Sequence, residues 1–220
     1  MGQLQHFITP RHTSTPRDYS LRNTPNKAEL AAKAKQFSYD YWDNTRQTGY
    51  GGYIDDGRWQ HFAQNLITTY KIESSSSVLD IGCGKGFLLS AFKKKDPTLC
   101  LAGLDISKYA IDLAPDDIKS NLIVGNVIDS CTFKKKYDYI FSLNTLHNLK
   151  LPDLFKALSN IQNQTKKKSY IVVESYRNEE EKWNLLQWQL TCECFYSPEE
   201  WLWIFNKTGY SGDYEFIYFE

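Results

Sequence analysis

The stretch Val78-Leu-Asp-Ile-Gly-Cys-Gly-Lys-Gly86 decides the fold of this chain. Val78 to Ile81 is a short apolar run with the length of a buried parallel strand. Glycines at positions 82, 84 and 86 then turn the chain, and residues 87–92 have an amphipathic helical pattern. Glycine lets the backbone approach a ligand closely, and a helix start offers free N–H groups. Strand, glycine turn and helix in this order predict a nucleotide-binding site.

The spacing of the glycines narrows the choice of ligand. A dinucleotide fingerprint, G-x-G-x-x-G, would need a glycine at position 87, where the sequence has Phe87. Asp80 stands two residues before Gly82, and its carboxylate would repel a bound pyrophosphate. It suits a ligand with positive charge and no phosphate, such as S-adenosylmethionine, which carries a sulfonium and an ammonium group. Taken alone, the motif is also compatible with a glycine-rich turn in another α/β protein.

Four further apolar runs follow the glycine turn, and helical patterns separate most of them: Leu99–Leu104, Asn121–Asp129, Tyr137–Asn144 and Ser169–Glu174. Most runs end in a polar residue, and ligands bind at the carboxyl edge of open α/β sheets. Asp105 stands close to the distance past the glycines at which an acidic residue accepts hydrogen bonds from ribose hydroxyls. We therefore predict a Rossmann-like α/β fold, a mostly parallel sheet with helices on both faces.

At these motifs the chain resembles the class I S-adenosylmethionine-dependent methyltransferases, over residues 77–175. Gly125-Asn-Val127 resembles their adenine-binding turn, usually Gly-Asp-Ala, with Asn126 in place of the acid. The resemblance implies methyltransferase activity, with S-adenosylmethionine as cofactor and S-adenosylhomocysteine as product. It also implies the cofactor-binding residues Asp80, Gly82, Cys83, Gly84, Asp105, Ile106, Asn126, Val127 and Asn144.

The flanks resemble a smaller bacterial subgroup that is associated with surface-polysaccharide biosynthesis. The stretches that carry this second resemblance are 37–43, 49–53, 56–59, 174–179 and 189–196. It implies methyl transfer to an oxygen of a small molecule, such as a sugar, a nucleotide-linked precursor or a phosphoryl-type modification. Two other function classes stay open: a non-catalytic S-adenosylmethionine-binding module, and an NAD-dependent oxidoreductase, against which Asp80 and Phe87 argue.

Composition constrains the partners. The 220 residues have a formal net charge of zero and a pI near 6.9, so the whole protein has no attraction to nucleic acid. The sequence Asn144-Thr-Leu-His147 also lacks an Asn/Asp-Pro-Pro-Tyr-like motif. We therefore expect a small-molecule substrate and no nucleic acid. The lysine triplets 93–95, 134–136 and 166–168 fit solvated helix ends and loops better than a basic rim.

No apolar run has the length of a membrane span, and the first residues have no apolar core like that of a signal peptide. We expect a cytoplasmic protein with no membrane partner. The five cysteines are odd in number and scattered, which argues against a disulfide framework. Cys192-Glu-Cys194 is a lone C-x-C pair, so we expect no metal site. The sequence leaves the oligomeric state open.

We predict two parts, an N-terminal extension and lid at residues 1–76 and a methyltransferase core at residues 77–220. Residues 1–25 are polar and contain prolines, and they are expected to be mobile or to lie across the domain. Class I methyltransferases usually end in two strands, the last antiparallel. Here few residues follow Gly209, so this hairpin is expected to be shortened, with its seventh strand short, missing or replaced.

The catalytic candidates follow the fourth and fifth strands. His147 has the pKa range of a general base at neutral pH, or it is a packed histidine at a helix start. Glu174 and Tyr176 follow the fifth strand, where Glu174 would orient the substrate or accept a proton. Arg177 would hold a carboxylate or phosphate, or it pairs with the acidic run that follows it.

The segment from Tyr41 to Trp59, here the aromatic segment, is rich in Tyr, Trp and Gly. Tyr50 and Gly51 are predicted to bring backbone close to the methionine end of the cofactor, and the aromatic rings to surround its sulfonium. Arg58 is a further candidate for the acceptor site. We interpret this segment as a lid; the alternative is aromatic packing of an N-terminal helix on the core.

Overall fold

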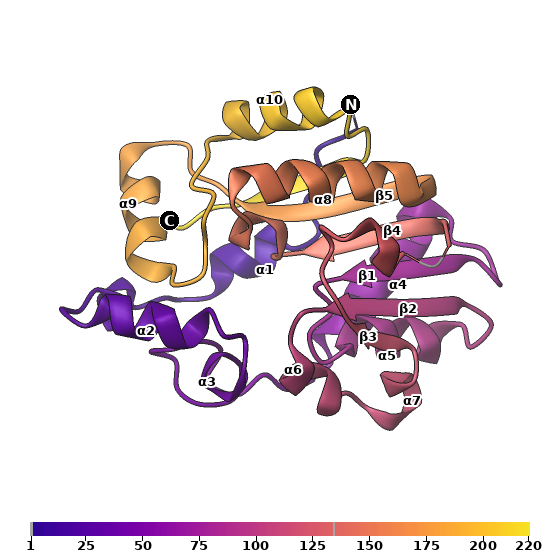
Figure 1. Ribbon diagram of the computed structural model, residues 1–220, viewed down its shortest axis with the longest axis horizontal. Coiled ribbons are helices and arrows are strands. Elements are labelled where there is room, and N and C mark those ends of the chain that lie inside the picture. Colours follow the sequence, from indigo (N-terminus) through magenta and orange to yellow (C-terminus); the bar gives the residue numbers. More distant parts are fainter. Residues whose placement is uncertain (1, 134) are drawn as a thin grey trace.

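The computed structural model describes residues 2–133 and 135–220; Lys134, in the second lysine triplet, lies outside them. One sheet of parallel strands in the order β3-β2-β1-β4-β5-β6 runs through the protein (Figure 1). The Rossmann-like α/β prediction is confirmed. The strands are β1 Ser77–Ile81, β2 Cys100–Asp105, β3 Leu122–Val124, β4 Tyr137–Leu143, β5 Thr165–Glu174 and β6 Asp213–Ile217.

Helices connect the strands and cover the sheet. Those before β1 are α1 Thr9–Ser14, α2 Lys27–Ala34, α3 Tyr39–Trp42 and α4 Arg58–Tyr70. The later ones are α5 Phe87–Lys95, α6 Lys108–Asp112, α7 Asp116–Lys119, α8 Leu151–Gln164, α9 Glu179–Trp188 and α10 Pro198–Thr208. Short 3₁₀ turns are η1 Tyr19–Arg22, η2 Ser130–Thr132 and η3 Leu146–Asn148.

The sheet is buried on both faces, which explains why its strands are continuous apolar runs. Along β5, Tyr170 and Val172 face a core that α4 and α5 complete. Ile171 and Val173 face the opposite core, which α8 and α10 complete. Figure 1 shows these two helix layers on either side of the strands. Because successive strand residues point to opposite faces, each run supplies both cores.

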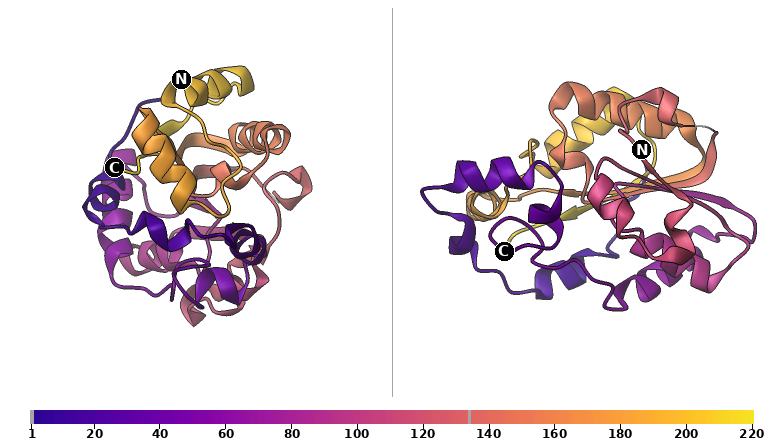
Figure 2. Two further views of the ribbon diagram at one scale, coloured as in Figure 1. Left: turned by 90° about the vertical axis from the view of Figure 1, so that its left-hand side faces the viewer. Right: turned by 60° about the horizontal axis from the view of Figure 1, so that its bottom comes forward.

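Helices α2 and α3 lie beyond the carboxyl ends of the strands (Figure 1). Figure 2, left, looks onto this end and shows α2 beside α9. The sequence predicts one helix over residues 26–39, but the chain forms α2 and α3 instead. Phe37 separates them in the left-handed region, with φ of 46°. The start of α10 is readable in the sequence Ser197-Pro-Glu-Glu200, where Ser197 and Glu200 form a capping box.

β6 is parallel to β5, and no antiparallel seventh strand follows it among the described residues. Its outer edge is covered instead by the start of the chain, where Leu4 forms a parallel bridge to Tyr214. The backbone N–H of Gln5 donates to the carbonyl oxygen of Tyr214 at 2.8 Å. Residues 2–25 therefore lie across the domain, and the start of the chain replaces the missing strand.

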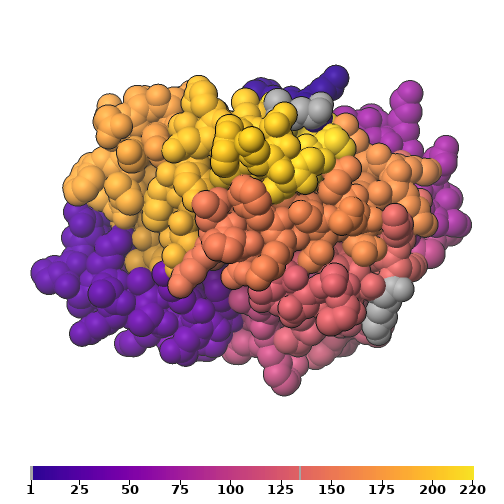
Figure 3. All heavy atoms as spheres, turned by 45° about the horizontal axis from the view of Figure 1, so that its top comes forward, coloured from indigo at the N-terminus to yellow at the C-terminus, as the bar shows by residue number. Residues whose placement is uncertain are grey.

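Glu215, buried in the middle of β6, fixes this start in place. Its carboxylate accepts hydrogen bonds from the backbone N–H groups of Phe7 and Ile8, both at 2.8 Å, and from Thr9. The Tyr170 hydroxyl donates to the same carboxylate. A buried carboxylate needs such partners, since charge is costly away from water. In Figure 3 the violet surface of the N-terminal part adjoins the orange surface of the later chain. No helix described here is long and apolar enough to cross a membrane.

Candidate active site

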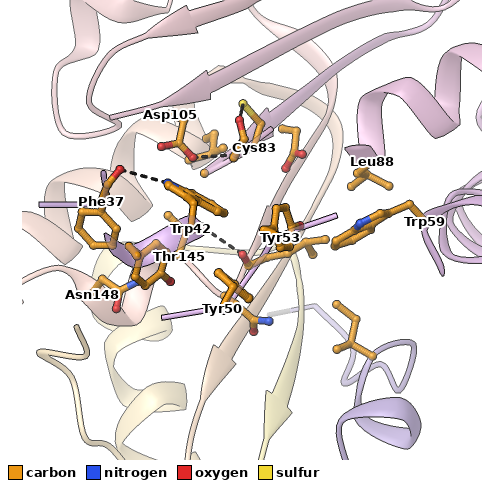
Figure 4. Close-up of a pocket in the computed structure, with 18 of the residues that line it drawn as sticks. Phe37, Trp42, Tyr50, Tyr53, Trp59, Cys83, Leu88, Asp105, Thr145 and Asn148 are labelled. Atoms are coloured by element: carbon orange, nitrogen blue, oxygen red, sulfur yellow. Dashed lines mark hydrogen bonds between the residues drawn. The ribbon is translucent and has the colours of Figure 1, made fainter. Parts of the chain in front are cut away.

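A cavity of about 600 Å³ lies at the carboxyl edge of the sheet. One side is formed by the ends of β1, β2 and β4, including Gly82, Asp105 and Asn144. The other side is formed by the aromatic segment and by residues 7–17, which include Arg11 and Arg17. Figure 4 shows rings of the aromatic segment directed toward the glycine turn. The fold therefore encloses one space between the predicted cofactor motifs and the N-terminal part of the chain.

The glycine turn is tightly packed. Gly82 and Gly84 have positive φ angles, 74° and 54°, which residues with a side chain rarely adopt. A Cβ on Gly82 would lie 1.9 Å from Oγ1 of Thr145, and one on Gly84 would lie 2.7 Å from the Trp42 ring. Neighbouring groups thus come as close to this backbone as atoms allow, and glycine is needed at both positions.

Two carboxyl groups flank the turn. Asp105 accepts hydrogen bonds from the N–H groups of Gly84 and Ser107, both at 2.7 Å, which fixes its orientation. Burial raises the pKa of Asp105. Burial, and then the nearby Asp105, raise the pKa of Asp80 to about 8. A cationic ligand beside Asp80 would favour its ionised form, as the sequence argument for a sulfonium ligand requires.

Trp42 connects the aromatic segment to the turn. Its indole N–H donates to Ser107 Oγ at 2.9 Å, and its ring stacks on Tyr50 with centroids 5.5 Å apart. In Figure 4, Trp42 lies between Asp105 and Tyr53. Rings at this place exclude water from the space above the glycines.

Lys85, inside the glycine motif, holds the same segment by charge. Its Nζ lies 2.7 Å and 2.8 Å from the two carboxylate oxygens of Asp43, and 2.9 Å from the carbonyl oxygen of Tyr53. Burial alone would raise the pKa of Asp43, but hydrogen bonds from Lys85, Tyr53 and Tyr109 outweigh it and lower that pKa. The aromatic segment is therefore bound directly to the loop that would bind the cofactor.

His147 is buried away from this large cavity. Its side chain is 2% exposed, and burial lowers its pKa to about 3. Nδ1 accepts from the backbone N–H of Glu174 at 3.3 Å, which leaves the proton on Nε2, 3.4 Å from Oε2 of Glu174. Such a histidine orients its neighbour. It is the packed alternative of the two interpretations that the sequence allowed.

Glu174 and Arg177, both after the apolar part of β5, have different surroundings. Glu174 is 5% exposed, and burial raises its pKa to about 8 although Arg17 and Arg22 oppose this. Arg177 pairs instead with Glu181 and Glu220, and neither it nor Tyr176 lines the cavity. We therefore no longer assign Arg177 and Tyr176 to the substrate, because the acidic run of α9 takes the guanidinium.

Most predicted cofactor residues do meet in the cavity. Gly51 does not line it, and its φ of 69° places it in a turn beside Arg46. Arg58 does line it, paired with Asp56 at 2.7 Å. The roles of these residues stay predictions. Those that line the cavity are Tyr50, Asp80, Gly82, Cys83, Gly84, Asp105, Ile106, Asn126, Val127 and Asn144.

The sequence argument missed the first residues of the chain as part of the site. Phe7, Ile8, Arg11, His12 and Arg17 all line the cavity. The one available signal was an acid, Glu215, within the largely apolar run at residues 214–219, because a buried carboxylate requires partners. The sequence does not show which segment supplies them.

Comparison with known proteins places this geometry in a family. A family model described as a methyltransferase domain matches residues 53–214, well over half of the chain. The chain belongs to this methyltransferase-domain family. The predicted enzyme class, a methyltransferase that uses S-adenosylmethionine, is thereby confirmed. The alternative of an NAD-dependent oxidoreductase is set aside.

The curated relatives of this methyltransferase include two bacterial enzymes named ribosomal RNA small subunit methyltransferase C. The one from Buchnera aphidicola subsp. Cinara cedri is 32% identical over 148 residues, 61% of this chain and 42% of the relative. The one from Psychromonas ingrahamii is 32% identical over 117 residues, 52% of this chain and 32% of the relative. The chain spans less than half the length of these relatives.

A solved structure also resembles this methyltransferase in fold. The plantazolicin methyltransferase BpumL, crystallised with a pentazolic substrate analogue and SAH, is 18% identical. The similarity covers 91% of this chain and 77% of that one, with a TM-score of 0.55. It extends over the N-terminal part as well as the core, and supports the Rossmann-like assignment.

The relatives correct the expectation about partners. A small-molecule substrate with no nucleic acid was expected, but the curated relatives are named for ribosomal RNA. The error has a physical reason: net charge sums over the whole surface, whereas nucleic acid responds to local charge. Arg11, Arg17, Arg46 and Arg58 all gather at the cavity of a protein whose net charge is zero.

Proposed function

We propose that this methyltransferase transfers a methyl group to an oxygen of a nucleotide-bearing acceptor. The observation that carries the proposal is the continuous cavity, which joins the cofactor motifs to arginines of the N-terminal part. A single volume with these two linings can hold cofactor and acceptor in contact. Methyl transfer depends on such alignment, because the two reactants then react as one bound unit.

Different residues of the cavity are proposed to bind different parts of the cofactor. Asp105, Asn126 and Asp80 all line the cavity, and we assign them to the ribose, the adenine and the cationic centre of the cofactor, respectively. S-adenosylmethionine, when bound, supplies an already activated methyl group. Trp42 and Tyr50 would keep water away from it. We propose on the same grounds that the aromatic segment acts as a lid, held to the glycine loop by Lys85 and Asp43.

The arginines support an anionic acceptor. Arg11 and Arg58 share a single carboxylate, that of Asp56, so the pair keeps an excess positive charge. Among the described residues, Arg17 donates hydrogen bonds to the carbonyl oxygens of His12 and Thr15 and to the ring of His12. Guanidinium groups bind phosphate and carboxylate oxygens in a fork geometry. An acceptor with an anionic group near its reacting oxygen matches this lining.

Two classes of nucleotide-bearing acceptor are each supported by a separate observation. The names of the curated relatives favour RNA. A nucleotide of an RNA would have to turn out of its strand to reach a cavity this deep. The resemblance of the flanks to a polysaccharide-associated subgroup favours a nucleotide-linked precursor of a surface polysaccharide.

One labelling experiment tests the proposal. The protein is incubated with methyl-tritiated S-adenosylmethionine and either small-subunit ribosomal RNA or a pool of nucleotide sugars, with Asp105→Ala as the inactive control. We expect label in one pool and none with the control. Digestion to nucleosides or sugars then locates the methyl group. Label on a base nitrogen, or in neither pool, would contradict the proposal.

A further inference from the structure

A second, smaller cavity adjoins the first. It measures about 150 Å³ and is lined by the end of β5, by the residues after α9 and by the N-terminal part. Arg17, Tyr50 and Asn144 line both cavities. The smaller space thus opens beside Asn144, at the end of β4, where the two halves of the large cavity meet. With a water molecule occupying about 30 Å³, it has room for one small polar group and not for a nucleoside.

The wall of this cavity contains an incompletely bonded carboxyl group. Oε1 of Glu174 accepts a hydrogen bond from Gln189. Oε2 has no hydrogen-bond partner among the described residues, and Nε2 of His147 lies 3.4 Å from it. Oδ1 of Asn144 is likewise buried without a partner. Buried polar atoms of native proteins are nearly always bonded, so these two indicate a group that completes them.

Three guanidinium groups surround the same space. Arg22 is 6% exposed and donates to the carbonyl oxygens of Arg46, Gly49 and Trp188. Arg46 donates to the carbonyl oxygen of Tyr50 at 3.1 Å. Neither these two nor Arg17 forms an ion pair within the described part of the chain. Three positive charges without a carboxylate partner create a strong field for an anion.

We propose that this cavity is an anion subsite that holds a phosphoryl or carboxylate group of the acceptor, with Arg17 and Arg46 donating to it and Glu174 hydrogen-bonded beside it. This rests on the proposed function for the identity of the reaction, but the subsite itself is defined by its own lining. With its pKa raised to about 8, Glu174 is protonated at neutral pH and donates from Oε2. A neutral carboxyl adds a hydrogen bond without repelling the anion.

The subsite also restricts the geometry of the acceptor. Its anionic group would lie past Asn144, so the reacting oxygen must lie a short distance from that group to remain in the large cavity. An acceptor without an anionic group at that distance would leave the arginines and Glu174 unpaired. Rejection of such acceptors follows from the cost of unpaired buried polar groups.

Direct binding of a simple anion tests the subsite. Protein saturated with S-adenosylhomocysteine is titrated with inorganic phosphate and, separately, with acetate. The readout is the indole N–H signal of Trp188, assigned with Trp188→Phe, since the guanidinium carbons of Arg22 and Arg46 lie 4.1 Å and 5.2 Å from its ring. We expect saturable shifts of this signal. The tighter-binding anion identifies the group as phosphoryl or carboxylate.

Variants test whether phosphate binds in this smaller cavity and not elsewhere in the site. Arg46→Ala and Arg17→Ala should each weaken phosphate binding at least tenfold, and Arg46→Lys should weaken it less. Arg177→Ala, which removes an arginine that lines neither cavity, is the matched control and should leave the affinity unchanged. Glu174→Gln keeps a neutral donor and should stay within about twofold of the wild-type affinity.

Three results would overturn the proposal. They are the absence of a saturable shift, an equal loss in Arg177→Ala, and an equal loss of S-adenosylhomocysteine affinity in Arg46→Ala. The last would show that the cavity takes the carboxylate of the cofactor. The subsite and the proposed function fail separately: phosphate binding with no methyl transfer to either pool would refute the function and leave the anion subsite in place.

Discussion

The two halves of the large cavity are built in different ways. The cofactor half comes from short-range elements: β1, the glycine turn and the end of β2 lie within residues 77–105. The acceptor half depends on Glu215, which binds the backbone of Phe7 and Ile8 across 207 or 208 residues. The comparison indicates that one half is encoded locally and the other by the meeting of distant segments. Substitutions should therefore affect the two halves separately.

The largest effect is expected at the glycine turn. Gly82→Ala would place a Cβ 1.9 Å from Thr145 Oγ1 and adds strain at positive φ. Crowding and strain together should cost about 3–5 kcal/mol, measured by chemical denaturation, and abolish S-adenosylhomocysteine binding. The control is Gly209→Ala, which has a similar φ of 69° but nothing within 4 Å, and should cost only about 1–2 kcal/mol. Equal losses would show that crowding at the turn is unimportant.

Asp105→Ala tests the cofactor half without disturbing packing. The substitution removes the acceptor predicted for the ribose hydroxyls, and calorimetry should show S-adenosylhomocysteine binding weakened by about 3 kcal/mol. The N–H groups of Gly84 and Ser107 lose their partner as well, so a modest loss of stability is expected. Asp112→Ala, on the exposed side of α6, should leave the affinity unchanged. Retained affinity in Asp105→Ala would refute the ribose assignment.

Glu215→Ala tests the acceptor half. It leaves the N–H groups of Phe7, Ile8 and Thr9 without their partner, which should lower the stability by about 2 kcal/mol. Protease cleavage within residues 3–17 should become faster, while S-adenosylhomocysteine affinity changes little. Glu215→Gln keeps one carbonyl oxygen as acceptor and should give an intermediate cleavage rate. If cofactor affinity falls as much as stability does, the two halves are not independent.

The smallest effect concerns pH. Burial raises the pKa values of Glu174 and Asp80 to about 8, so the stability they contribute at low pH is lost as pH rises toward and through 8. His147 and His12 have lowered pKa values, about 3 and 4, and their contribution is lost only as pH falls below about 6.5. Between pH 7 and 8.5 the carboxyl groups therefore dominate. Each should account for about 1 kcal/mol of lost stability in the ligand-free protein.

Chemical denaturation across that range gives the measurement. Between pH 7 and 8.5, the unfolding free energy of Glu174→Gln should fall by about 1 kcal/mol less than that of the wild type. Glu180→Gln, an exposed position on α9, is the matched control and should leave the dependence unchanged. A Glu174→Gln profile that parallels the wild type would mean that Glu174 is ionised in the folded protein at neutral pH.

The same contrast explains what could be predicted from the sequence. The strands and the glycine turn could be located because burial on two faces produces apolar runs, and ligand contact demands glycine. The contacts of Trp42 with Gly84 and of Asp43 with Lys85 could not, because a side chain carries no signal of its partner in a distant segment. For His147 and Arg177 the sequence left two interpretations open for a related reason. Their chemistry is visible in the sequence, but their burial and their neighbours are not.

The hold of Glu215 on residues 7–9 also orders the assembly of the molecule in time. Closing a loop of more than 200 residues is entropically costly, and contacts so distant form late in folding. The sheet from β1 to β5 can assemble before β6 joins it, whereas the carboxylate that fixes the backbone of residues 7–9 arrives only with β6. During refolding, affinity for S-adenosylhomocysteine should therefore return before the arginines at the acceptor end take up their positions.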